Sequence, residues 1–197
     1  MFTLYFNLGI HHIADIYSYD HILFLICLTA VYLLRQWKQI LILVTAFTIG
    51  HTTSLILATY RIINISSSWI EFLIPVTIFI TGLWNVWVFS DKVEKKAHWA
   101  KYITAIFFGL IHGLGFSNYL QQLLANEKDI FTSLLAFNIG IEVGQLIIVL
   151  FIMLLNILMI HTLRVNRRDW VHVFSGAGMG VAITLMISRF PLLNVLL

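Results

Sequence analysis

Six long apolar segments limit what this chain can fold into. They fall at about residues 20–34, 40–59, 69–90, 102–124, 131–160 and 171–191. About 20 helical residues cross the hydrocarbon core of a bilayer, so every segment but the first is long enough to span it. Hydrophobic residues make up 60% of the chain and charged residues 11%, whereas soluble domains carry about 25% charged residues. The sequence therefore predicts an integral membrane protein.

The predicted fold is all-α, a polytopic membrane bundle of six transmembrane helices that forms a single domain over residues 1–197. Residues 2–14 are expected to be a short interfacial or re-entrant segment, although they could also extend the first helix. The first nineteen residues hold no Lys or Arg and carry two adjacent histidines and an aspartate. A cleaved secretory signal is therefore not expected there.

Basic residues in the connecting loops predict the orientation. Nine Lys and Arg residues lie between the first and second, third and fourth, and fifth and sixth segments, whereas the opposite side carries Arg61, Lys128 and Arg189. The positive-inside rule makes the first group cytoplasmic and both termini external, in a bacterial inner membrane. The net charge of +3 then reflects topology, and no nucleic-acid partner is expected.

Six ionisable side chains lie within or at the ends of these apolar segments. Each costs about 2.5–3.5 kcal/mol at the centre of a membrane helix, so such residues usually face one another or a cavity. The predicted topology puts three near the outer helix ends and three within one or two turns of the midplane. We expect all six to share a cavity that opens outward. The outer three are Asp20, His21 and Glu71, and the deeper three are His51, His112 and Glu142.

Imidazole and carboxylate groups together are typical ligands of Ni, Co or Zn ions, and His12 adds a fourth imidazole just before the first segment. Asp20 and His21 are adjacent and point about 100° apart on a helix, so one is expected to bind the ion and the other to orient a partner. The absence of cysteine from this set argues against a soft Cu(I) site.

Each residue also has a plainer interpretation. His12, Asp20 and His21 would also suit a wet helix end, and His51 would suit packing with both ring nitrogens satisfied. Glu71 follows a serine run, as an acid in the first turns of a helix often does. Glu142 would also fit a protonated, interhelical hydrogen-bond cluster with neighbouring amides. In helix 102–124, a GxxxG pattern around His112 predicts close approach of another backbone.

Four motifs resemble the HupE/UreJ family of hydrogenase and urease accessory membrane proteins. They are a histidine followed by a DH pair (His12 to Asp20 and His21), FTxxH ending at His51, FGLIHGxGF around His112, and FNxGxExxQ around Glu142. They cover most of the chain in the expected order. The resemblance implies a six-helix protein associated with the uptake of nickel, and of cobalt as a second cargo. It also implies a metal role for His12, Asp20, His21 and Glu142.

The leading functional prediction is a divalent transition-metal permease with a His/Asp/Glu site in an outward-facing cavity. The alternative is an intramembrane zinc-type metalloenzyme, a hydrolase, which would use the same cluster to activate water. A purely structural metal is a third interpretation. The expected partners are the metal ion and the lipid bilayer, and a homo-oligomer is left open.

Overall fold

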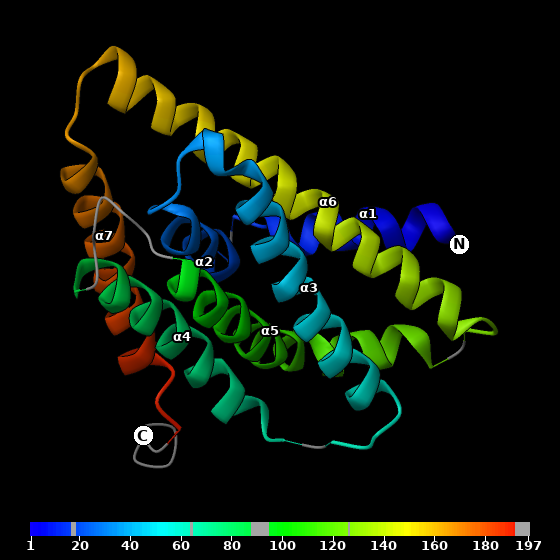
Figure 1. Ribbon diagram of the computed structural model, residues 1–197. Coiled ribbons are helices and arrows are strands. Elements are labelled where there is room, and N and C mark those ends of the chain that lie inside the picture. The colour runs from blue at the N-terminus through cyan, green and yellow to red at the C-terminus, as the bar shows by residue number, and fades with distance from the viewer. Residues whose placement is uncertain (17–18, 64, 88–94, 126, 192–197) are drawn as a thin grey trace.

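The computed structural model describes residues 1–16, 19–63, 65–87, 95–125 and 127–191, and no strand occurs among them (Figure 1). The predicted all-α fold is therefore confirmed for this part of the chain. In chain order the α-helices are α1 (Phe2–Ala14), α2 (Asp20–Thr29), α3 (Trp37–Thr59), α4 (Ser67–Trp87), α5 (Lys95–Leu124), α6 (Ile130–Ile157) and α7 (Arg167–Ser188). A 3-10 turn, Leu34–Gln36, leads into α3, and a π-helical turn, Leu158–Thr162, extends α6.

Five of the described helical segments are long and apolar enough to cross a membrane. They are Leu34–Thr59, Ser67–Trp87, Trp99–Leu124, Ile130–Thr162 and Arg167–Ser188. The prediction of six spans is not confirmed. The first apolar segment, 20–34, forms only the ten-residue α2. At 1.5 Å per residue this helix is about 15 Å long, half the roughly 30 Å of the hydrocarbon core.

The N-terminal helix α1 packs along α6 (Figure 1). Glycines on both helices allow the backbones to touch, because a Cβ on Gly9 would collide with the carbonyl oxygen of Phe137 and one on Gly140 with that of Phe6. The backbone of Asp15 is extended, so α1 ends there and does not continue into α2 as one helix. Residues 2–14 thus dock on the bundle instead of extending the next helix.

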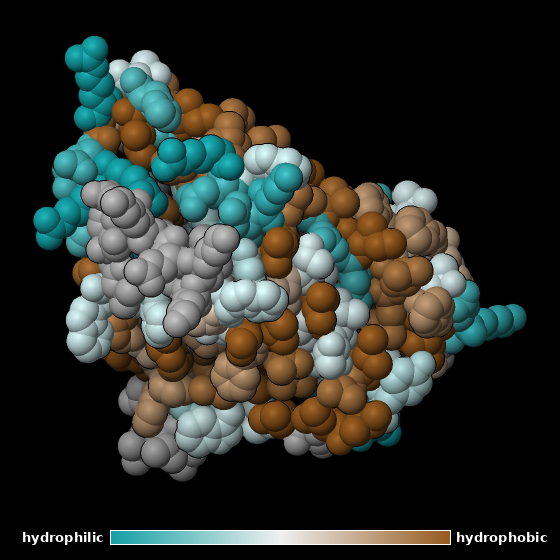
Figure 2. Space-filling model, viewed as in Figure 1, coloured by the Kyte–Doolittle hydropathy of each residue, from teal (hydrophilic) through white to brown (hydrophobic). Residues whose placement is uncertain are grey.

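The outer surface suits a lipid environment. On the face in Figure 2, apolar side chains cover much of the bundle, and hydrophilic ones gather at the end where α6 passes into α7. Large side chains on α6 point outward, including Ile147, Phe151 and Leu154, which are all more than half exposed. Asp129 lies just before α6 and caps it by accepting the backbone N–H of Thr132. Hydrogen bonds from the side chain and then the backbone of Thr132 lower the pKa of the Asp129 carboxyl.

Helices α3 and α5 form the most extensive interface of the described bundle. The predicted close approach at the GxxxG pattern is confirmed. A Cβ on Gly109 would collide with the carbonyl oxygen of Phe47, and one on Gly113 with that of His51. Small residues let membrane helices pack at this range. The contact brings His51 of α3 and His112 of α5 to neighbouring positions.

Substituting Gly109 with valine is expected to destabilise the bundle, because the new side chain meets backbone that cannot rotate away. Overpacking of this kind costs about 1–3 kcal/mol. Thermal unfolding in detergent measures the effect. Gly176→Val is the matched control, since among the described residues no atom beyond its own helical turn lies within 4 Å of a Cβ at Gly176. Equal unfolding temperatures for the two variants would contradict a tight α3–α5 contact.

Candidate metal centre

Histidines from three helices converge inside the bundle. His12 of α1, His21 of α2 and His51 of α3 each offer a ring nitrogen, and these nitrogens lie within 4.8 Å of one another. Nitrogens on one tetrahedral ion, with bonds of about 2.0–2.1 Å, stand about 3.4 Å apart. Small ring rotations would therefore bring the three onto one ion. His112 of α5 adjoins them, with its ring centroid 5.1 Å from that of His21.

Most ring nitrogens of this cluster are buried and have no hydrogen-bond partner among the described residues. His51 is 0% exposed, His112 1% and His21 5%. Six ring nitrogens lack a hydrogen-bond partner among the described residues: Nε2 of His12, both nitrogens of His21, both of His51 and Nδ1 of His112. Each unsatisfied buried polar atom costs about 1–3 kcal/mol. A metal ion at their meeting point would satisfy several at once, so the donor set fits a metal.

Thr77 of α4 sets the tautomer of His112. The Thr77 hydroxyl donates to the carbonyl oxygen of Ile74 at 2.7 Å and lies 2.9 Å from Nε2 of His112. A hydroxyl has a single proton, so Nε2 must be the donor of the second bond. Nδ1 of His112 then carries the lone pair. Hydrogen bonds of this kind orient metal-ligating histidines in many sites.

Asp20 touches the cluster at the start of α2. Its Oδ1 accepts the backbone N–H of His21 at 3.1 Å and lies 3.3 Å from Nδ1 of the same residue. Its Oδ2 accepts a hydrogen bond from the guanidinium of Arg189 at 3.1 Å. A carboxylate beside one ring nitrogen leaves the other, Nε2, to face an ion. Asp20 therefore has the geometry of a group that orients His21.

A cavity of about 650 Å³ reaches the cluster from one end of the bundle. His12, His21 and His112 line it, whereas His51 lies behind them. The other ionisable side chains that line the cavity are His11, Asp15, Asp20, Glu71 and Arg189. The predicted convergence thus takes in four histidines and Asp20, with Glu71 on the wall of the same cavity.

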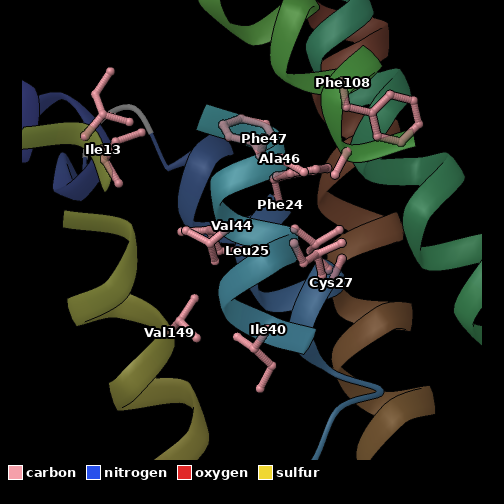
Figure 3. Close-up of a cluster of buried hydrophobic side chains, with 14 of the residues drawn as sticks. Ile13, Phe24, Leu25, Cys27, Ile40, Val44, Ala46, Phe47, Phe108 and Val149 are labelled. Carbon is pink, nitrogen blue, oxygen red and sulfur yellow. The ribbon is translucent and has the colours of Figure 1, made fainter. Parts of the chain in front are cut away.

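An aromatic layer closes the other side of the cluster. The centroid of the Phe24 ring lies 5.0 Å from that of His112 and 4.9 Å from that of Phe47. The centroid of the Phe47 ring lies 6.1 Å from that of His51. Phe108 adjoins Phe24 at 6.1 Å. These rings belong to the buried apolar cluster in Figure 3, which continues along α2, α3 and α6 away from the histidines. The cavity is therefore open on one side and sealed by apolar side chains on the other.

The structure places Glu142 in a different pocket, between α3 and α6, lined by threonines and Asn138. Its Oε1 accepts a hydrogen bond from the hydroxyl of Thr45 at 2.7 Å. Two parallel bonds join the same helices, from Thr48 to Gln145 at 2.8 Å and from Thr52 to Asn138 at 2.7 Å. Glu142 was expected among the deeper residues of the shared cavity. Its observed bonds match the interhelical cluster that the sequence left open.

Glu142→Gln is accordingly expected to leave metal affinity unchanged, because the amide oxygen can still accept from Thr45 and the residue is not among those lining the histidine cavity. Asp20→Asn is the comparison and is expected to weaken binding through its contact with His21. Isothermal titration of both variants with Ni²⁺ measures the two affinities. A large loss in Glu142→Gln would show that this carboxylate reaches the ion after all.

Sequence reasoning missed two residues of this site. Thr77 carried no signal, because a threonine in an apolar segment usually bonds its own helix. Arg189 was counted only as a loop charge, although it contacts Asp20 across 169 positions of sequence. A lone arginine at the end of a membrane segment, on the side poor in basic residues, is the signal that could have found it.

The chain matches a known protein family. The model of a family described as HupE / UreJ protein matches residues 1–190, which is nearly the whole chain. No curated protein and no solved structure matches. The family match agrees with the resemblance of the four motifs. Five of the six ionisable residues in those motifs lie at the histidine cluster, and Glu142 is the exception.

Proposed function

We propose that this chain, which belongs to the HupE/UreJ family, is a permease for a divalent transition-metal ion such as Ni²⁺ or Co²⁺. The observation that carries the proposal is the buried meeting point of His12, His21 and His51, with His112 beside it. Imidazole nitrogen suits these borderline ions better than it suits Mg²⁺ or Ca²⁺, which prefer oxygen.

The cavity supports passage from the outside. Glu71 lies in the first turns of α4 and Arg189 directly follows α7, so the cavity opens at the bundle end where those termini lie. That end carries few basic residues, and the positive-inside rule makes it external. A hydrated ion would meet the acids Asp15 and Glu71 first. It would then exchange water for imidazole at the cluster.

Release on the other side requires the aromatic layer to move, because Phe24 and Phe47 lie directly against the histidines. Alternating access in membrane transporters places the substrate between one open and one closed side, with the site near mid-depth. The arrangement of an open cavity, a polar site and an apolar floor fits the outward-open state of such a cycle.

Uptake into vesicles tests the proposal. The full chain in proteoliposomes is expected to accumulate ⁶³Ni²⁺, and His21→Ala to abolish accumulation, since His21 contacts the three other histidines. His161→Ala is the matched control, because His161 is exposed and lies at the far end of α6. Tight metal binding without accumulation would count against a permease. Hydrolysis of a lipid or peptide by the same sample would favour the zinc-type enzyme.

A further inference from the structure

Arg189 binds the carboxylate that would also attract a metal ion at the cluster. Its guanidinium lies 3.1 Å from Oδ2 of Asp20, while the other oxygen of that carboxylate lies 3.3 Å from His21. Asp20 is buried, with 7% of its surface exposed. A buried carboxylate needs a nearby positive charge, because the unpaired ion is costly in a medium of low dielectric constant. Arg189 supplies that charge from the end of α7.

The charge balance of the site makes this pair important. Neutral imidazoles donate lone pairs but no negative charge, so a divalent ion among them gains most from the carboxylate that touches the cluster. Of the described residues lining the cavity, Arg189 is the one lysine or arginine. Its positive charge repels an arriving cation, and it already holds Asp20. The ion and the guanidinium therefore compete for one carboxylate.

We propose that Arg189 acts as a stand-in cation, which means that it neutralises Asp20 when no metal ion is bound. It is a positioning residue that acts through Asp20 and keeps metal affinity low enough for release. This inference rests on the proposed metal-binding function. In the metal-free site the guanidinium neutralises Asp20 and keeps the carboxylate beside His21. When an ion binds, it takes over part of that role. Arg189 then favours the metal-free state and opposes trapping of the ion.

The competition predicts the direction of the effect. Arg189→Gln removes the competing charge, so Ni²⁺ binding by the full chain in detergent is expected to become about tenfold tighter, which is about 1.4 kcal/mol. Arg189→Lys keeps the charge and is expected to bind as the unmodified chain does. A residue that only supported the fold would give weaker binding, or none, when replaced by glutamine.

A double-mutant cycle tests the route through Asp20. In an Asp20→Asn background, Arg189→Gln is expected to tighten Ni²⁺ binding by less than it does in the unmodified chain, because the carboxylate for which the two cations compete is gone and only the direct repulsion of the ion is removed. Titration calorimetry of the four proteins gives the coupling. Unchanged or weaker binding in Arg189→Gln, or the same tightening in both backgrounds, would overturn the proposal. Absence of Ni²⁺ binding by the unmodified chain would instead overturn the proposed function.

The unfolding temperature gives a second test, because losing the Asp20–Arg189 ion pair also removes a contact from the metal-free protein. If Arg189→Gln unfolds at a lower temperature without metal, Ni²⁺ is expected to raise its unfolding temperature by more than it raises that of the unmodified chain. The ion then supplies the missing positive charge as well as binding the histidines. An equal or smaller rise would contradict the stand-in role.

Discussion

His51→Leu is expected to lower the affinity for Ni²⁺ by at least about 100-fold, since even the loss of an outer-shell partner of a metal site costs 10–100-fold. His51 offers its ring nitrogen to the cluster from α3 and is fully buried. Leucine has a similar volume and leaves little cavity. Equilibrium binding of the purified chain measures the change, with His161→Leu as an exposed control.

The same variant separates a ligand from a packing residue. Both nitrogens of His51 lack hydrogen-bond partners among the described residues, so the imidazole costs stability in the metal-free protein. His51→Leu should therefore unfold at the same or a higher temperature without metal, and should lose the stabilisation that Ni²⁺ gives the unmodified chain. A clear drop in the metal-free unfolding temperature would indicate that His51 serves packing instead.

The sequence predicted most of the bundle because membrane burial imposes a strong pattern. Five apolar segments correspond to five long helices, and the glycines around His112 predicted a close helix contact that α3 supplies. The sixth expected span, at residues 20–34, is not confirmed, and there is a physical reason. Hydropathy reports whether a segment can lie among apolar groups, and α2 does so as a ten-residue helix inside the bundle. Apolar burial alone does not require a span.

The site was predicted in part, for a related reason. Burial cost indicates that ionisable residues must find partners, but it does not say which partners. The buried histidines lie against one another; they are His12, His21, His51 and His112. Glu142 instead accepts a hydrogen bond from Thr45 on the neighbouring helix. Helical phase decides this. Glu142 lies on the face of α6 that carries Asn138, and that face meets the threonine stripe of α3. Depth in the membrane could not distinguish the two outcomes.

Phe24→Ala is expected to lower the free energy of unfolding by about 3–5 kcal/mol, the usual cost of replacing a buried phenylalanine by alanine. Phe24 is 0% exposed and its ring contacts Phe47, Phe108 and His112. Chemical unfolding in detergent measures the loss. Phe107→Ala is the matched control, since Phe107 lies on α5 and is 58% exposed.

The position of Phe24 also predicts a change in transport. The ring separates the histidines from the apolar interior beyond them, so its removal leaves a void directly against His112. Water entering a void beside polar groups would shorten the dry path across the layer. Vesicles with Phe24→Ala should therefore show metal flux that no longer saturates with ion concentration. If the variant lost stability while flux stayed saturable, the aromatic layer would be packing alone, and the barrier to the ion would lie in the movement of whole helices.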